Sequence, residues 1–317
     1  MNAPRVAVVV PSWNSEDDLP ACIESVRGQS GVAVEQHVVD NGSTDRSVEV
    51  LERLGAPHDR WDRNRGFAAA VNRGIQTTSA PFVLVLNADA RLAEGCLSTL
   101  VSRLAADPGL GGVQPKILQA GGAGPQRIYS VGQAITAGGR AHEIGAGQPD
   151  GDEYGVGSLV FGVCGAVCLL RREMLEQLGG YDERYFAFYE DVDLNARGRL
   201  LGWAFACEPD AVAEHIGAAS WSRQPSKAAA RFNARLVARN RLATSLKVLP
   251  ARSAPYVVAV EVGSLVRAVP RRTFRATALG MAEALGLLPD LLRERRDLSS
   301  GGRSRLLRPW LSSRPSR

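Results

Sequence analysis

The chain lacks the features that would place it in several common classes of protein. It has no run of about 18 apolar residues, and the nearest stretch, residues 256–266, is short and contains Glu261, so no membrane-spanning helix is expected. It has no GxGxxG or GxxxxGK(S/T) pattern, which argues against dinucleotide-binding dehydrogenases and P-loop enzymes. The opening Met-Asn-Ala-Pro-Arg leads directly into an apolar strand and does not resemble a signal peptide.

Cysteine is also scarce, and its spacing does not suggest a disulfide framework. The five cysteines are an odd number and include no CxxC pair; they are Cys22, Cys96, Cys164, Cys168 and Cys207. We expect them to be small buried apolar residues in the reducing environment of a cytosol.

The charge is unevenly distributed along the 317 residues, whose length and 45% hydrophobic content suit one large α/β domain with an appendage. Residues 223–317 carry 20 Arg and Lys against 5 Asp and Glu, a balance of +15, whereas residues 1–222 carry 18 against 28, a balance of −10. An acidic body with a basic tail predicts an anionic partner for the tail. Aromatic residues are sparse there and no nucleic-acid motif is present, so the pattern favours anionic lipid over nucleic acid.

The first 110 residues alternate apolar strands with amphipathic helices. The pattern predicts strands at 6–10, 34–39 and 81–86, and helices at 16–26, 43–54 and 66–76. This succession implies an α/β fold with a mostly parallel central sheet flanked by helices on both faces.

The remainder of the chain is less regular. Residues 107–160 are rich in glycine, and we expect a loop-heavy insertion with short strands that carries acceptor specificity. Ordered structure is expected at 163–170, 172–178, 191–201 and 204–207, followed from residue 226 by helices alone. These patterns predict a catalytic domain at 1–222, a basic helical extension at 223–299 and a disordered basic tail at 300–317.

Acidic residues follow two apolar segments. Glu190, Asp191 and Asp193 come directly after the aromatic-rich stretch 185–189, and Asp89 follows a buried strand. Buried carboxylates are costly unless they are paired, bound to metal or used chemically, and desolvation makes them better bases near neutral pH. Open α/β sheets bind their ligands at the carboxyl ends of strands. Each acid alone has a structural explanation, as a helix N-terminal acid or a turn residue, but together they favour a catalytic cleft.

Two polar motifs lie between these strands. Asp40, at a strand end, can accept hydrogen bonds from a nucleobase imide, and the Gly42 turn that follows favours phosphate. The triplets Asn64-Arg65-Gly66 and Asn72-Arg73-Gly74 stand eight residues apart, where their polar side chains can line a pyrophosphate pocket. Asx turns and helix caps explain the same residues as well, so both readings stay open.

The motifs, in their order along the chain, resemble those of family 2 glycosyltransferases, most of all the bacterial rhamnosyltransferase branch. They are Val9-Val10-Pro11-Ser12-Trp13-Asn14, Val39-Asp40-Asn41-Gly42-Ser43-Thr44-Asp45, Asn64-x-Gly66-Phe67-x4-Asn72-x-Gly74, Leu86-Asn87-x-Asp89 and Gly179-Gly180-Tyr181-Asp182-Glu183-x-Tyr185-Phe186-x3-Glu190-Asp191-Val192-Asp193-Leu194. The resemblance covers roughly residues 5–220 and implies a GT-A fold, a nucleotide-diphosphate sugar donor and inversion at the anomeric carbon by a single displacement.

The resemblance also implies roles for individual residues. Asp191 matches the general base, and Asp89, with His215, matches the ligands of a divalent cation, Mn²⁺ or Mg²⁺. Asn87 stands where the family has an acid, which is a weaker metal ligand. Glu190 and Asp193 are expected to support the base or cap its helix. Tyr189 and Trp203 can pack against a sugar ring or belong to the core. The expected donor-binding residues are Pro11, Ser12, Asn14, Asp40, Asn41, Asn64, Gly66, Asn72, Asn87 and Asp89.

The sequence thus predicts an inverting glycosyltransferase that moves a deoxyhexose such as rhamnose, from a thymidine-diphosphate donor, to a saccharide or lipid-linked acceptor. We expect it in the cytoplasm, bound peripherally to the inner face of the membrane through residues 223–317. The alternative for those helices is packing on the catalytic domain or formation of a homodimer. Two other classes stay open: a sugar-phosphate nucleotidyltransferase, whose Gly-rich loop with Arg and Lys is absent after the first strand, and a non-catalytic saccharide-binding protein of the same fold.

Overall fold

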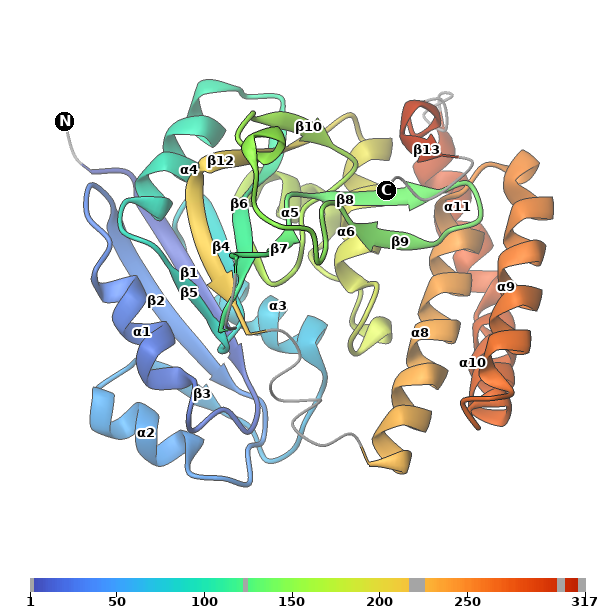
Figure 1. Cartoon of the computed structure of the whole chain (residues 1–317), viewed down its shortest axis with the longest axis horizontal. Helices are drawn as coiled ribbons and strands as arrows, with labels where there is room; N and C mark the ends of the chain where they lie inside the picture. The colour runs from blue at the N-terminus through green and yellow to red at the C-terminus, as the bar shows by residue number, and fades with distance from the viewer. Residues whose placement is uncertain (1–2, 122–124, 217–225, 301–305, 313–317) are drawn as a thin grey trace.

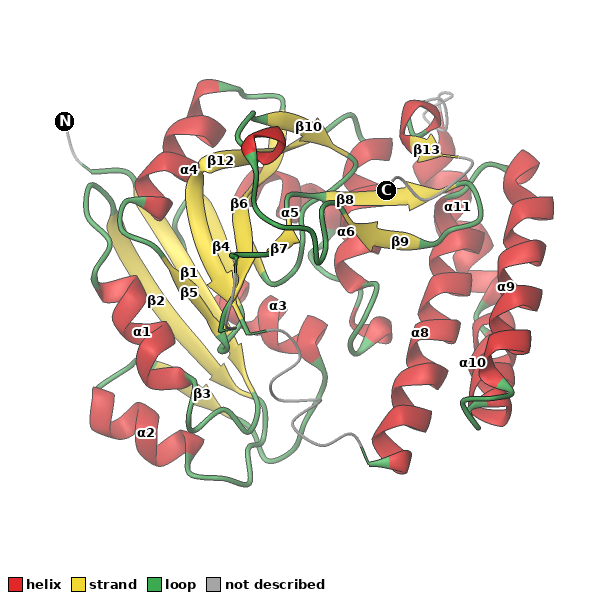
Figure 2. Ribbon diagram, viewed as in Figure 1, coloured by secondary structure: helices red, strands yellow, loops and turns green. Residues whose placement is uncertain are grey.

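A central β-sheet with helices on both faces forms the body of the protein, and a group of long helices lies at one side of it (Figure 1). The computed structural model describes residues 3–121, 125–216, 226–300 and 306–312. The α/β class and the C-terminal helices expected from the sequence are confirmed, as the colouring by secondary structure shows (Figure 2).

The main sheet has the strand order β10-β12-β6-β11-β4-β1-β2-β3, with β5 paired to β12 and β7 to β6. Its strands are β1 (Arg5–Ser12), β2 (Ala33–Asp40), β3 (His58–Arg60), β4 (Phe82–Leu86), β5 (Ala90–Leu92), β6 (Leu110–Gln119), β7 (Ile128–Ser130), β10 (Ser158–Val160), β11 (Val167–Arg171) and β12 (Ala204–His215). Strands β3, β2, β1 and β4 are mutually parallel, β12 is parallel to β6, and β11 is antiparallel to both of its neighbours. A second sheet contains β13 (Leu311–Ser312), β8 (Gln133–Thr136) and β9 (Ala141–Glu143).

The alternation of side chains along β1 explains why both faces of the sheet are covered. Val6, Val8 and Val10 point to the face packed by α1 (Leu19–Arg27) and α4 (Cys96–Ala106). Ala7 and Val9 point to the opposite face, which is packed by α3 (Phe67–Thr77) and α5 (Arg172–Leu178). A strand buried on both faces is therefore apolar throughout, as the sequence shows.

The remaining helices are α2 (Ser47–Leu54), α6 (Glu190–Leu200), α8 (Lys227–Val248), α9 (Ala254–Ala268), α10 (Phe274–Gly286) and α11 (Leu288–Ser299). Val192, Ala196 and Leu200 of α6 share a buried cluster with Val248 at the end of α8. Helices α10 and α11 pack in turn on α8 through a second cluster that contains Leu242 and Met281. The extension thus packs on α6 of the sheet domain through α8.

Several details differ from the sequence-based expectation. Strand β6 was expected to be part of an irregular insertion, yet it is a ten-residue strand in the main sheet. Helices α1 and α2 begin three and four residues later than expected, at Leu19 and Ser47. Residues 306–312, expected in a disordered tail, form a short 3-10 helix and β13, and Leu307 is buried. The rest of residues 301–317 lies outside the described residues.

Two expectations about buried residues and membrane spans can also be compared with the structure. All five cysteines are buried and none forms a disulfide, which confirms their expected role as small apolar residues. No helix within the described ranges is both long and apolar enough to cross a membrane.

Candidate active site

A cavity of about 570 Å³ opens at the carboxyl ends of β1 and β4. Each of its walls comes from a different part of the chain. On the side of the main sheet, Pro11 and Ser12 end β1, Asn87 and Asp89 follow β4, and His215 ends β12. Glu190 and Asp191 begin α6. The remaining wall is formed by Gln133 on β8, Glu143 on β9, and Asn233 and Val237 on α8. The structure therefore brings together three of the acids that the sequence singled out, namely Asp89 after a strand and Glu190 and Asp191 at the start of a helix.

Asp89 and His215 meet in this cavity although 126 residues separate them along the chain. The Nε2 atom of His215 lies 2.9 Å from Oδ1 of Asp89 and 3.3 Å from the side-chain nitrogen of Asn87. Antiparallel pairing of β5 with β12 sets His215 opposite Ala90 and so fixes this approach. The His215 ring and the Asp89 carboxylate are both at least nine-tenths buried. A carboxylate and an imidazole in contact can share one divalent cation, so the pair fits the expected metal site.

The described residues do not by themselves complete a coordination shell. Within those ranges no three His, Cys, Asp or Glu side chains converge as a metal cluster. The side-chain oxygen of Asn87 is buried and has no hydrogen-bond partner in the described part of the chain. A cation held by Asp89 and His215 would therefore take further ligands from the amide oxygen of Asn87, from water and from a bound diphosphate, as Mg²⁺ and Mn²⁺ commonly do.

Asp191, the expected base, lies in the first turn of α6 with most of its hydrogen-bonding capacity in use. Its Oδ2 atom accepts from the side-chain nitrogen of Gln133 at 2.7 Å and from the amide of Gly165 at 3.0 Å, and Oδ1 accepts from the amide of Val192 at 2.8 Å. Burial raises the pKa of Asp191, although the hydrogen bond from Gly165 opposes this rise. Since each carboxylate oxygen has two acceptor sites, Oδ1 keeps one of them for a substrate proton.

Two other acids line the same cavity. Burial and the nearby charge of Asp191 raise the pKa of Glu190 well above its ordinary value, and one of its oxygens has no partner among the described residues. Burial, again with a contribution from Asp191, raises the pKa of Glu143 to about 7. A cluster of acids in a shielded cavity favours the neutral form of some of its members, and such perturbed groups are typical of active sites.

The segment that presents these acids has an unusual backbone. Phe188 and Tyr189, directly before α6, have positive φ angles of 68° and 67°, a conformation that non-glycine residues rarely adopt. The side-chain nitrogen of Asn240, on α8, donates to the carbonyl oxygens of Tyr185, Ala187 and Phe188. Helix α8 therefore holds the loop that leads to Asp191, and unusual backbone of this kind is concentrated at functional sites.

The expected donor residues at the ends of β1 and β2 form one connected group. Asn41 donates to the side-chain oxygen of Asn64 and to the carbonyl of Gly66, and it accepts from the amide of Arg65. Asp40 is fully buried, and its Oδ1 atom has no partner within the described chain. An unpaired buried carboxylate oxygen is costly, so it is suited to accept a hydrogen bond from a bound base.

Six expected site residues do not line the cavity: Asp40 and Gly66, described above, and Asn14, Asn72, Trp203 and Asp193. Asn72 uses its side chain to bind the backbone of Tyr181 and the carboxylate of Glu183, Asn14 accepts from the amide of Thr44, and Trp203 donates to Gln177. Asn72 therefore joins α3 to the segment before α6, a structural role, because both hydrogens of its amide and one acceptor site of its oxygen are used there.

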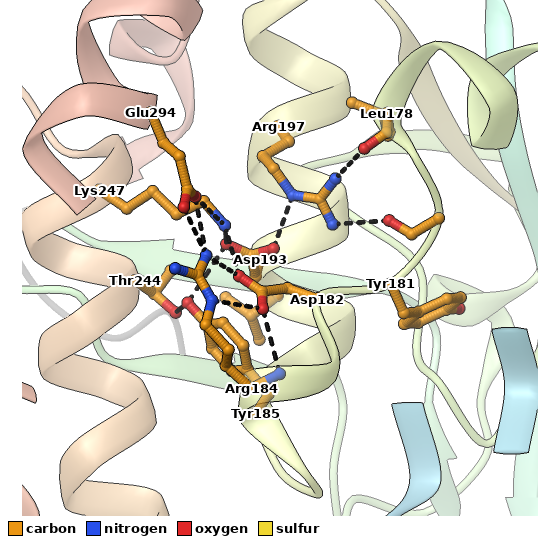
Figure 3. A network of polar contacts seen from close by, with 12 residues as sticks. Leu178, Tyr181, Asp182, Arg184, Tyr185, Asp193, Arg197, Thr244, Lys247 and Glu294 are labelled. Atoms are coloured by element: carbon orange, nitrogen blue, oxygen red, sulfur yellow. Dashed lines mark hydrogen bonds and ion pairs between the residues drawn. The ribbon is translucent and has the colours of Figure 1, made fainter. Parts of the chain in front are cut away.

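Asp193, another of these six residues, belongs instead to a buried ion network (Figure 3). Its carboxylate lies 2.6 Å from Nε of Arg197 and 3.0 Å from Nζ of Lys247, and the hydroxyl of Tyr185 donates to it at 3.2 Å. Lys247 also lies 2.9 Å from the carboxylate of Asp182. Asp193 thus ties α6 to α8 and is unsuited to act as an alternative base.

Sequence reasoning did not identify Gln133, Glu143 and Tyr129. All three come from short strands of the glycine-rich insertion, which was expected to carry acceptor specificity but without named residues. No described residue of the cavity wall is Arg or Lys, whereas four are acids: Asp89, Glu143, Glu190 and Asp191. An anionic ligand bound here would therefore need a cation for its neutralisation.

The fold and site define a class of enzyme with an acid-lined cavity at the carboxyl edge of an α/β sheet. A family model described as Glycosyl transferase family 2 matches residues 7–179, more than half of the chain, and the chain belongs to this family. An N-acetylglucosaminyl-diphospho-decaprenol L-rhamnosyltransferase of Mycobacterium tuberculosis is 29% identical over 220 residues, which cover 60% of this chain and 68% of that protein. An uncharacterized glycosyltransferase of Escherichia coli, YibD, is 32% identical over 102 residues, or 31% of this chain and 30% of that relative.

Solved structures show the same fold. A mannosyltransferase from Pyrobaculum calidifontis, determined in complex with GDP-Man and Mn²⁺, has a TM-score of 0.56 at 18% identity, over 98% of this chain and 88% of that one. GalNAc-T7, determined with UDP, GalNAc and Mn²⁺, has a TM-score of 0.66 at 15% identity, over 91% of this chain and 58% of that one. The GT-A fold expected from the sequence is thereby confirmed.

Proposed function

We propose that the protein is an inverting glycosyltransferase that moves a sugar from a nucleotide-diphosphate donor to a hydroxyl group of a saccharide acceptor. The observation that carries this proposal is the position of Asp191. Its Oδ1 atom keeps an acceptor site in the cavity that also contains the Asp89–His215 pair. A base and a site for diphosphate within one cavity are what a single displacement at the anomeric carbon requires.

The reaction follows from this arrangement. The acceptor hydroxyl gives its proton to Oδ1 of Asp191 while its oxygen forms a bond to the anomeric carbon, and the bond from that carbon to the diphosphate breaks on the opposite face. The raised pKa of Asp191 strengthens it as a base at neutral pH, and the Gly165 amide keeps the carboxylate oriented. When bound by Asp89 and His215, a divalent cation would neutralise the charge that develops on the departing nucleoside diphosphate.

The donor end of the cavity is suited to a nucleoside diphosphate. Asp40, which ends β2 and precedes the cavity-lining Asn41, offers a buried oxygen to the imide of a pyrimidine base. The Ser12 hydroxyl, in the cavity wall, is buried without a partner in the described part of the chain. Asn41 and Asn64 are hydrogen-bonded to each other and to the backbone of Gly66, which fixes the conformation of this segment. Similarity to the mycobacterial rhamnosyltransferase supports a deoxyhexose such as rhamnose as the sugar and a lipid-linked saccharide as the acceptor. We propose that the reaction belongs to the synthesis of cell-envelope polysaccharide.

The same proposal places the enzyme on the cytoplasmic face of the membrane. Val258, Val262 and Val266 of α9 are spaced four residues apart and are 55–65% exposed, so they form an apolar stripe on that helix. Arg267, and beyond it the exposed Arg271 and Arg272, lie at the end of this stripe. Valines beside arginines suit the interface of an anionic bilayer, where each basic residue contributes ~1 kcal/mol.

Release of nucleoside diphosphate tests the activity. Purified protein is incubated with a panel of nucleotide sugars, with and without Mn²⁺, and with a set of alkyl glycosides as acceptors. We expect metal-dependent release from one class of donor, fastest with dTDP-rhamnose, together with a glycosylated product of inverted anomeric configuration. Retention of configuration, or synthesis of a nucleotide sugar from a sugar phosphate, would contradict the proposal.

A further inference from the structure

Gln133 connects two carboxylates in the cavity. Its side-chain nitrogen donates to Oδ2 of Asp191 at 2.7 Å and to Oε1 of Glu143 at 3.0 Å. Gln133 is 3% exposed and stands at the first position of β8, whereas Glu143 is the last residue of the neighbouring β9. The insertion therefore adds a second acid at a fixed position beside the expected base.

The orientation of this amide is determined by its surroundings. The side-chain nitrogen of the fully buried Asn195 donates to the backbone carbonyl of Val163 at 2.8 Å and to the side-chain oxygen of Gln133 at 2.9 Å. A backbone carbonyl only accepts hydrogen bonds, so the nitrogen of Asn195 must face it, and the oxygen of Gln133 must face that nitrogen. Both hydrogens of the Gln133 amide are consequently directed to the two carboxylates.

Glu143 is held in place without a positive charge. Its Oε2 atom accepts from the hydroxyl of Ser130 at 2.6 Å, and Oε1 accepts from Gln133. Each of these two oxygens keeps further acceptor capacity, and Glu143 lines the cavity. Asp191, Cys164 and Tyr129 lie around it and carry no positive charge, and burial lowers the pKa of the neighbouring His142, which disfavours its charged form. Burial and the like charge of Asp191 oppose ionisation of Glu143, so this carboxylate does not stabilise the fold. Binding of a substrate explains its presence better.

We propose that Glu143 binds the acceptor beside Asp191, so that the two carboxylates receive two neighbouring hydroxyl groups of one saccharide. One hydroxyl is the nucleophile and gives its proton to Asp191; the other donates a hydrogen bond to Glu143 and anchors the ring. This inference rests on the proposed glycosyltransferase activity and names its acceptor class, a sugar with a vicinal diol. Glu143 forms no bond to the transferred sugar, and its role is to orient the nucleophile.

The test compares Glu143→Gln with the wild-type chain on alkyl glycosides that present either an intact diol or a single deoxy position next to the nucleophilic hydroxyl. Glu153→Gln, an exposed glutamate of the same insertion, is the matched control. A hydrogen bond to a charged group is worth about 10- to 100-fold in affinity, so we expect the acceptor KM to rise by about that factor in Glu143→Gln. The donor KM should change less than about twofold.

The deoxy acceptor separates binding from a structural effect. If Glu143 binds the second hydroxyl, the wild-type enzyme loses the same factor on the deoxy acceptor, and Glu143→Gln loses nothing more when the diol is replaced. Two results would overturn the inference. One is an acceptor KM in Glu143→Gln equal to that of the wild type. The other is a rise in KM caused by Glu143→Gln that is equally large on the diol acceptor and on the deoxy acceptor. If Glu143→Gln does not fold, the wild-type enzyme alone gives the test. An acceptor KM that is unchanged by removal of either neighbouring hydroxyl group would then overturn the inference.

Failure of the proposed activity gives a different result. Calorimetric titration of wild-type protein with nucleotide sugar and Mn²⁺ reports the donor site without any acceptor. Donor binding and turnover with no effect of Glu143→Gln contradicts only the role of Glu143. A wild-type protein that neither binds nor consumes any donor contradicts both proposals.

Discussion

Nζ of Lys247 on α8 lies 3.0 Å from the carboxylate of Asp193 on α6, and this ion pair joins the C-terminal extension to the helix that begins the active site. Lys247 is 2% exposed and also contacts Asp182 and Glu294 (Figure 3). Burial alone would lower the pKa of Lys247, yet Asp193 and Asp182 raise it. The ammonium group is therefore charged inside the protein, and the extension is part of the folded unit.

Replacement of Lys247 by Met should destabilise the protein strongly. The substitution leaves buried carboxylates without their cation, and breaking a buried pair in this way typically costs about 3–5 kcal/mol. Chemical denaturation followed by circular dichroism measures the loss. Lys227→Met, at the exposed start of the same helix, is the control and should stay within about 0.5 kcal/mol of wild type. Equal stability of the two variants would contradict a structural role for this network.

The donor site is expected to depend on a divalent cation. Asp89→Ala should weaken Mn²⁺-dependent binding of a nucleotide sugar, because one of the two converging protein ligands is lost. Asn87→Asp should strengthen it, since a carboxylate is a better ligand than an amide. Isothermal titration with and without chelator measures both effects, and the exposed Asp210→Asn serves as control. Undiminished donor binding in excess chelator would contradict the cation site.

The stability of the protein should fall as pH rises through the titration of Glu143. Its pKa is about 7 in the folded protein against an ordinary value of 4.5, so between these values the folded state holds a proton that the unfolded chain has released. Proton release from the unfolded chain favours unfolding in this window. Glu143→Gln removes this contribution, and its melting temperature should decline less than that of wild type between pH 4.5 and 7. Parallel pH profiles for the two proteins would refute the raised pKa.

Membrane association should depend on the apolar stripe of α9. We expect the wild-type protein to sediment with vesicles of phosphatidylglycerol and phosphatidylcholine, less so as salt increases, and to be released when Val258, Val262 and Val266 are all replaced by Ser. These side chains are exposed, so the replacements leave the core intact. Removal of the whole extension is a poorer test because α8 packs on α6. Absence from anionic vesicles at low salt would exclude this mode of association.

The sequence predicted those strands and strand ends whose apolar pattern matches their buried position in the sheet. Strands β1 and β4 are apolar because both faces of the sheet are covered, and β2 is apolar and buried where it approaches Asp40, so Asp40 and Asp89 could be placed at strand ends in advance. The resemblance identified His215 as a site residue, but the sequence did not predict that a strand continues as far as His215. Glu208-Pro209-Asp210 suggests a turn, whereas β12 continues past a register shift between Glu208 and Val212 to reach Asp89.

The acceptor side was not predictable in the same way. Gln133 and Glu143 lie on strands of four and three residues, too short to show a period. The hydrogen bond from Gln133 to Asp191 joins residues 58 apart in the chain and depends on tertiary packing. Asn72 shows the opposite case, because a polar motif residue that seemed suited to a ligand is used to bind Tyr181 and Glu183. Only the folded structure separates these roles.

The most direct test of the account is the rate of transfer by Asp191→Asn under saturating donor and acceptor. The amide preserves the shape of the side chain but cannot accept the proton at Oδ1, and loss of a general base typically costs ~10²–10⁴ in rate. We predict a fall of this size in kcat, with donor binding by calorimetry within about twofold of wild type. Near-native turnover by Asp191→Asn would contradict the assignment of Asp191 as the base.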